Sequence, residues 1–225
     1  MTYDFYIKSK DDICAAVQDF GFVPLFKSAV PGFSIEENVS PRAWFYGNEE
    51  GVWEWKGPVI RETGCAYGKF FDGRPGFISR KWFYDFANYR RNGYDFDSRC
   101  DDGLAPFTDK TLFDLLNKNA PILSRGLKNL GNYKKGGRIG FETIITRLQM
   151  QCYVLVSDFV YDVGKDGKIY GWGVTEYSTP EISMGKDFTE KVYKREPEES
   201  FVRILNHFKK LFPDCDEKIL RKMIG

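Results

Sequence analysis

Apolar residues recur at intervals of three and four along much of the chain, and this spacing places them on one face of a helix. In the first such stretch, Ile13, Val17 and Phe20 follow Ser9, a favourable N-cap residue, and the pattern ends at Gly21. The same reasoning predicts further helices at residues 80–91, 109–119, 125–130, 138–148, 197–211 and 216–224. The proline-containing segment 22–41 is predicted to be a loop with one short turn at Ser34–Asn38.

Two hairpins are predicted between these helices. Asp72-Gly73 separates two apolar runs, and Asp-Gly between such runs is a strong hairpin signal. β-Branched and aromatic residues at 152–161 and 169–178 predict a second pair of strands, joined by a loop that contains Asp166-Gly167. The aromatic segment 44–55 places large rings around the turn residues Gly47, Asn48 and Gly51.

The second half of the chain therefore reads helix, short strand, short helix, turn, helix, strand, hairpin loop, strand. This order is typical of a winged helix-turn-helix, in which three helices and a two-stranded ribbon close one core. We expect an α+β fold with three parts: an aromatic-rich N-terminal region at 1–105, the winged helix-turn-helix at 106–180 and a C-terminal helical extension at 181–225. The segment 92–106 is predicted to be a polar boundary, and 181–195 an irregular surface connection.

Composition narrows the possible functions. Of the 225 residues, 42% are hydrophobic and 17% aromatic, which indicates a globular chain with a large core. Five scattered cysteines without a CxxC motif and a single histidine, His207, disfavour zinc sites and histidine-based catalysis. His207 is expected at the solvent edge of a helix. Without a signal peptide or an apolar run that could span a membrane, we expect a cytoplasmic protein with no cofactor, metal or membrane partner.

The net charge is only +1, so any case for nucleic acid depends on local clusters of cations. Because the third helix of a DNA-binding winged helix enters the major groove and the wing touches the backbone, cations near both are candidate ligands. The candidates in the winged-helix segment are Arg125, Lys128, Lys134, Lys135, Arg138, Arg147, Lys165 and Lys168. A second candidate lies at a helix end, where Arg90 and Arg91 combine charge with flanking tyrosines.

Gln149-Met150-Gln151 is the most specific candidate for catalysis. If this segment is a strand, the two amides point to the same face and could hold a water or read a base edge. Two other functions remain open. One is a protein-interaction module anchored by Trp44, Trp53, Trp55 and Trp82, and the other is a sensor with a ligand pocket between the halves. Whether the protein is an enzyme is left open.

Four long motifs resemble those of the bacterial AlkZ-related proteins: CAYGKFFDGRPGFIS, WFYDFANYRRNGYDFD, LQMQCYVLVSDF and YGWGVTEYSTPE. The resemblance runs from about Ala43 to Glu181. That family is similar to the AlkZ and YcaQ DNA glycosylases, winged-helix enzymes that excise alkylated bases and use a Gln-apolar-Gln motif. The resemblance implies DNA binding, and it implies that Gln149 and Gln151 orient a hydrolytic water and support the charge that develops on the sugar.

Overall fold

The computed structural model describes residues 5–44, 51–165, 167 and 169–225. Within them the chain forms an α+β fold, as the sequence predicts, with one six-stranded antiparallel sheet in the order β1-β3-β2-β5-β6-β4. The strands are β1 (Phe22–Pro24), β2 (Ala66–Phe71), β3 (Arg74–Ile78), β4 (Ile122–Leu123), β5 (Leu155–Val163) and β6 (Ile169–Ser178).

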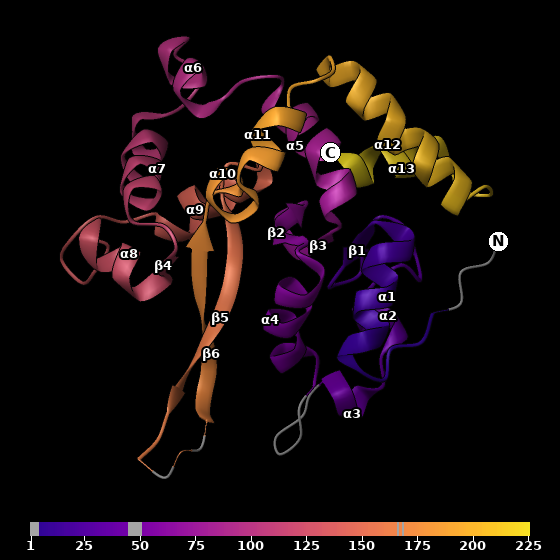
Figure 1. The fold of residues 1–225 in the computed structure, drawn as a ribbon, viewed down its shortest axis with the longest axis horizontal. Coiled ribbons are helices and arrows are strands. Elements are labelled where there is room, and N and C mark those ends of the chain that lie inside the picture. Colours follow the sequence, from indigo (N-terminus) through magenta and orange to yellow (C-terminus); the bar gives the residue numbers. More distant parts are fainter. Residues whose placement is uncertain (1–4, 45–50, 166, 168) are drawn as a thin grey trace.

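Helices surround this sheet in both halves of the chain (Figure 1). The first half contains α1 (Lys10–Phe20), α2 (Ile35–Asn38), α3 (Pro41–Trp44), α4 (Val52–Thr63), α5 (Arg80–Arg91) and α6 (Phe96–Asp101). The second half contains α7 (Phe107–Asn119), α8 (Ser124–Leu130), α9 (Phe141–Met150), α10 (Pro180–Met184), α11 (Lys186–Lys191), α12 (Pro197–Leu211) and α13 (Glu217–Ile224).

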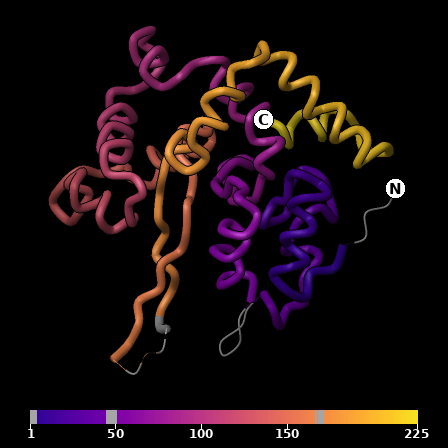
Figure 2. Tube along the Cα trace, viewed as in Figure 1, coloured from indigo at the N-terminus to yellow at the C-terminus, as the bar shows by residue number. Residues whose placement is uncertain are grey.

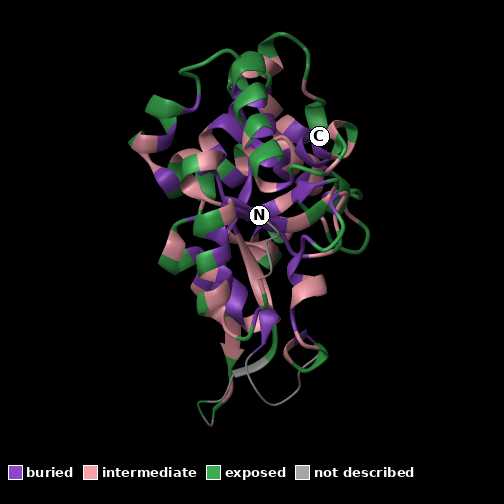
Figure 3. Cartoon of the chain, turned by 90° about the vertical axis from the view of Figure 1, so that its right-hand side faces the viewer, coloured by how far each residue is buried: buried purple, intermediate pink, exposed green. Residues whose placement is uncertain are grey.

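Strands β1 and β2 and the first two residues of β5 are mostly buried, and they are largely apolar. Adjacent strand residues point to opposite faces, so Phe77 joins one core cluster and Ile78 the other. The first cluster packs α1, α4, α7 and α9 on one face, and the second packs α5, α11, α12 and α13 on the other. Figure 3 shows the buried residues concentrated between these layers, with exposed residues on the outer helices.

The hairpin of β5 and β6 is longer than the rest of the sheet. Its paired residues run from Leu155↔Ser178 to Val163↔Ile169, and the ribbon extends away from the helices (Figures 1 and 2). At its base, β6 pairs with β4 through Tyr177 and Glu176. On the other side, β5 pairs with β2 through Val156 and Tyr67, so one sheet joins strands of both halves.

Several sequence predictions were wrong. The structure has a strand at Phe22–Pro24, a helix at Phe96–Asp101 and two helices in the segment that was expected to be irregular, Pro180–Met184 and Lys186–Lys191. The short turn at Ser34–Asn38 is present as α2, with Ser34 as its N-cap. Of the predicted aromatic turn, Gly47 and Asn48 lie outside the described residues, and Gly51 is the N-cap of α4.

The largest omission is α4, because it contains Gly57 and Pro58, which normally interrupt helices. Contacts with other parts of the fold explain why both residues are tolerated in this helix. A Cβ atom at Gly57 would lie 2.8 Å from Asp158 Oδ1, so glycine permits the close approach of α4 to β5. The buried face of α4, which includes Val59 and Ile60, packs into the first core cluster and offsets the hydrogen bond that Pro58 removes.

Candidate nucleic-acid interface

The loop between α8 and α9 is held in shape by its own backbone. Tyr133 N donates to Lys128 O at 2.8 Å, Gly137 N donates to Lys134 O at 2.8 Å, and Arg138 N donates to Asn132 O at 2.7 Å. The ring of Tyr133 packs edge-on against Phe141, the first residue of α9, with 5.4 Å between centroids. The loop is therefore braced against the core, and its cationic side chains extend outward.

Three cations on this loop are exposed to solvent: Lys134, Lys135 and Arg138. Within the described part of the chain, none of the three forms an ion pair. Their positive charge is consequently not neutralised by a neighbouring carboxylate. The sequence placed these residues at the start of the third helix, and the structure shows them just before it, because α9 begins at Phe141 rather than Arg138.

Two further predicted ligands connect α8 to its neighbours. Arg125 pairs with Asp162 of β5 at 3.3 Å, and Lys128 pairs with Glu142 of α9 at 2.8 Å. All four side chains are partly or largely exposed, so these pairs are weak and open to exchange with a polyanion. Lys165 is exposed near the end of the β5–β6 hairpin, and Lys168 lies outside the described residues.

Arg147 differs from these cations because it is bound to a buried carboxylate. Its Nε donates to Asp109 Oδ2 at 2.7 Å, and its Nη2 donates to Asp109 Oδ1. Asp109 on α7 is only 1% exposed, so the pair fastens α9 to α7. The bond to Asp109 raises the pKa of Arg147.

Arg90 and Arg91 hold the fold together, and the expectation that they are open to nucleic acid is wrong for Arg91. Arg91 is fully buried: its Nη2 donates to Cys152 O at 2.8 Å, and its Nη1 donates to Glu181 and to the Tyr193 hydroxyl at 2.6 and 2.8 Å. The guanidinium of Arg90 donates to three main-chain oxygens, of Met150, Ile224 and Phe70. These bonds tie the end of α5 to the α9–β5 junction and to α13.

The glutamine pair does not lie on a strand, and that part of the prediction is wrong. Gln149 belongs to α9, and Gln151 is the C-cap residue of the same helix. Residues two apart on a helix point in different directions, so the amides do not lie side by side. Gln149 is 1% exposed; its Oε1 accepts from Lys69 N and its Nε2 donates to Ile145 O, both at 3.1 Å.

Gln151, in contrast, lines an open hollow of about 370 Å³ at the end of α9. The other lining residues are Tyr89, Arg90, Arg147, Met150 and Gly225. Tyr89 reaches the chain end through a 2.7 Å bond from its hydroxyl to Gly225 O. Residues of the glutamine motif and two of the predicted cations therefore meet at this hollow.

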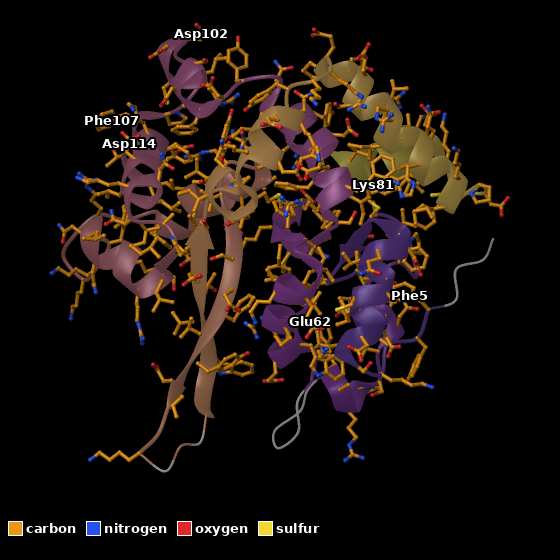
Figure 4. The ribbon with its side chains drawn as sticks, in the orientation of Figure 1. Phe5, Glu62, Lys81, Asp102, Phe107 and Asp114 are labelled. Carbon is orange, nitrogen blue, oxygen red and sulfur yellow. The ribbon has the colours of Figure 1, made fainter. Side chains whose placement is uncertain are left out.

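A second groove, of about 550 Å³, runs between α7 and the α8–α9 loop. Phe107 and Asp114, labelled in Figure 4, lie on its α7 side, and Leu130 and Arg138 lie on the other. Phe107 is 81% exposed, and Ile139 beside Arg138 is 91% exposed. Apolar and cationic surface are therefore adjacent at the entrance to α9.

Of the four tryptophans proposed as interaction anchors, two are buried, and Trp53 and Trp82 are partly exposed. Trp44 and Trp55 are buried in the first core cluster, so they cannot anchor a partner. Trp82 stacks on His207 at 4.2 Å between ring centroids. His207 on α12 is half-buried; its Nε2 lies 2.7 Å from Phe20 O, and burial lowers its pKa.

Lys56 on α4 is a buried cation that periodicity did not reveal. Its Nζ lies 4.7 Å from the centroid of Trp53 and 4.1 Å from that of Phe159. Burial lowers its pKa to about 8. The sequence gives no local signal for this arrangement, because Phe159 comes from β5, about a hundred positions further along the chain.

Cysteine and metal chemistry have little support within the described residues. Burial raises the pKa of the Cys65 and Cys152 thiols to about 12, so both stay protonated. The described ranges contain no group of three His, Cys, Asp or Glu side chains arranged to hold a metal ion. Across the same ranges, every helix is too short or too polar to cross a bilayer.

Comparison with known proteins gives one match. A family model described as AlkZ related matches residues 7–225, nearly the whole chain. The resemblance found from sequence motifs is thereby confirmed, and it extends beyond Ala43 to Glu181 at both ends. No curated protein and no solved structure matches the chain.

Proposed function

The chain belongs to the AlkZ-related family, and on that premise we propose that residues 107–178 form a winged helix-turn-helix that binds duplex DNA. The arrangement behind this proposal is the order α7, β4, α8, α9, β5 and β6, with β4 paired to the base of the β5–β6 hairpin. In this interpretation α9 is the recognition helix and the hairpin is the wing.

The single observation that carries the proposal is the braced loop before α9. Lys134, Lys135 and Arg138 are exposed, free of ion pairs among the described residues, and held on a backbone that Tyr133 anchors to the core. Cations of this kind release counterions when they meet phosphates, which supplies most of the affinity of sequence-independent DNA binding.

The middle of α9 is covered by the first hairpin, and this favours a backbone-directed mode. Lys69 Nζ donates to Thr146 Oγ1 at 3.0 Å, and a Cβ atom at Gly73 would lie 3.8 Å from the Thr146 methyl group and 3.9 Å from the Met150 sulfur. The N-terminal end of α9, where Glu142 and Thr143 are exposed, and its preceding loop are more open to a DNA groove than the middle of the helix. Contacts from this end reach phosphates more readily than base edges, so we expect weak dependence on DNA sequence.

The test measures binding to a fluorescently labelled duplex at low salt, with fluorescence anisotropy as the readout. The wild-type protein is expected to bind, and the triple variant Lys134→Glu, Lys135→Glu, Arg138→Glu is expected to bind about 100-fold more weakly. The control is Lys8→Glu with Lys218→Glu, two exposed lysines on other surfaces. Absence of wild-type binding at low salt, or equal loss in the control, would contradict the proposal.

Base excision is a finer proposal for the same protein, supported by the hollow beside Gln151. Incubation with duplex that carries an N3- or N7-alkylated purine is expected to leave abasic sites, and Gln151→Ala is expected to remove that activity without changing the melting temperature. Gln149→Ala is expected to lower stability, because Gln149 bonds to backbone groups of β2 and α9. No abasic product from a panel of lesions would indicate DNA binding without excision.

An interaction module is the second candidate function, and the exposed side chains of Phe107, Leu130 and Ile139 favour it. Phe107 and Leu130 line the groove beside Arg138, where an apolar partner segment could bury them. Copurification of a stoichiometric protein that is lost in Phe107→Ser with Ile139→Ser, together with no DNA affinity, would decide in favour of this function.

A further inference from the structure

A groove of about 550 Å³ lies between α5, α11 and α12, away from the α8–α9 loop. Its wall begins near Lys81, which is labelled in Figure 4 on α5. The lining consists of one tyrosine and eight charged residues: Tyr84, Arg80, Lys81, Asp85, Asp187, Lys191, Lys194, Arg195 and Arg203. These residues span positions 80 to 203 and become neighbours only in the folded chain.

The lining of this groove carries an excess of positive charge. Six cations face two carboxylates, which leaves four positive charges, whereas the whole chain carries only +1. The remainder of the protein is therefore net negative. A concentration of positive charge of this size raises the local concentration of anions at the groove.

The two carboxylates organise the cations rather than cancel them. Asp85, 5% exposed, accepts from Arg203 Nε at 3.1 Å and from Arg195 Nη1 at 3.4 Å. Asp187 accepts from Arg80 Nε at 3.2 Å, and it also bonds Tyr84 and Lys191. Each guanidinium has five N–H donors, so donors remain for a ligand after these bonds are made.

Lys81 and Lys194 complete the rim. Both are exposed, and within the part of the chain that the structure describes neither forms an ion pair. The bond from Lys191 and the bond from Tyr84 lower the pKa of Asp187 to about 2, so this organising carboxylate stays ionised at neutral pH.

The lining chemistry indicates which anion the groove fits. Pockets for small molecules are mainly apolar, with a few polar groups that fix orientation. This groove has a single aromatic ring, that of Tyr84, and the rest of its lining is charged. Several separate cations along an open groove fit a ligand with repeated negative charges.

We propose that the groove between α5, α11 and α12 binds the phosphodiester backbone of a nucleic acid, as a contact separate from the α8–α9 loop. The inference rests on the proposed DNA binding and extends the bound length of DNA beyond one face of the protein. Multiple phosphate contacts at two places would increase affinity and strengthen its dependence on salt.

The test uses Lys81→Glu with Lys194→Glu in the full chain, because these lysines make no ion pair whose loss would affect folding. We expect an affinity for duplex DNA at least 10-fold lower, and a slope of log K against log salt smaller by about two. The double variant Lys8→Glu, Lys218→Glu is the matched control. Melting temperatures of all variants verify that they are folded.

The outcomes separate this inference from the proposed function. If Lys81→Glu with Lys194→Glu binds like wild type while the Lys134, Lys135 and Arg138 variant does not, the groove inference is wrong and the proposed function stands. If only the groove variant loses affinity, the α8–α9 proposal is wrong. If calorimetry shows that pyrophosphate binds the groove as tightly as an oligonucleotide, a small anion is the ligand and the backbone assignment is overturned.

Discussion

Residues 89–94 and residues 133–138 have similar local sequences but differ in how far their cations are buried in the fold. Both combine a tyrosine, two adjacent cations and glycine, Tyr-Arg-Arg-Asn-Gly-Tyr in one and Tyr-Lys-Lys-Gly-Gly-Arg in the other. In the first segment Arg91 is fully buried, and in the second both lysines are exposed. The first segment therefore stabilises the fold, whereas the second leaves positive charge at the surface.

The difference follows from what surrounds each segment. The guanidinium of Arg91 packs against the rings of Tyr153 and Phe188, 4.6 and 5.0 Å from their centroids, and it donates to three polar groups. A planar guanidinium is suited to such a site, whereas a lysine ammonium is strongly hydrated and stays in water. Neighbouring cations and tyrosines are thus a poor indicator of nucleic-acid binding until their partners are known.

Replacement of Arg91 is expected to have the largest effect. Arg91→Met leaves Cys152 O and the Tyr193 hydroxyl without their donor and is expected to lower the free energy of unfolding by about 3 kcal/mol. Urea denaturation measures this change. Arg138→Met is the matched variant in the other segment and is expected to change stability by no more than about 0.5 kcal/mol. Similar losses in both would refute the contrast between the segments.

Breaking the ion pair of Arg147 and Asp109 is expected to lower stability by an intermediate amount. Arg147→Gln leaves the carboxylate of Asp109 buried without its charged partner and is expected to cost about 2 kcal/mol at pH 7. Asp109→Asn in the same background is expected to recover part of the loss, because a neutral amide is less costly to bury. A double-mutant cycle by thermal denaturation measures the coupling, and additive effects would show that the pair contributes nothing.

Replacement of Lys56 is expected to have a smaller effect on stability, and to raise stability rather than lower it. Lys56→Met removes a buried charge and is expected to raise the free energy of unfolding at pH 7 by about 1 kcal/mol, since the rings of Trp53 and Phe159 offset part of the burial cost.

The advantage of that variant should shrink with rising pH. The pKa of Lys56 in the folded state is about 8, below the ordinary 10.5, so between these values the unfolded chain binds more protons. The wild type therefore gains stability relative to Lys56→Met as the pH rises through this range, and the full cost of the charge is present below about 8. Denaturation curves at pH 7, 8.5 and 10 test this, and a constant difference would contradict it.

The exposed lysines are expected to matter least for stability. Lys134→Gln with Lys135→Gln should leave the free energy of unfolding unchanged within about 0.5 kcal/mol. The same variant should reduce the slope of log K for DNA binding against log salt by about two. Anisotropy titrations at several salt concentrations measure the slope. A destabilised variant would mean that these lysines support the fold after all.

Local sequence predicted much of the fold. The apolar period indicated α1, α5, α7, α9 and α12, and Asp72-Gly73 indicated the β2–β3 turn, where both residues have positive φ. It did not indicate α4, because the reason for its glycine and proline lies in Asp158 and in the core. The hypothesis for Gln149 and Gln151 depended on a strand at these positions, although the helical pattern of Ile144, Ile145 and Leu148 continues through Gln149.

What the sequence by itself determined was most of the longer helices, the two hairpins and the positions of cations beside α9, because period, capping and turn residues act within a few neighbours. Only the tertiary structure decided which of those cations stay exposed. Arg91 meets Cys152, Glu181 and Tyr193 across 61 to 102 positions of chain, and the cations of the α5–α11–α12 groove converge from equally distant segments. Burial and pairing depend on such contacts between remote segments, and no local pattern encodes them.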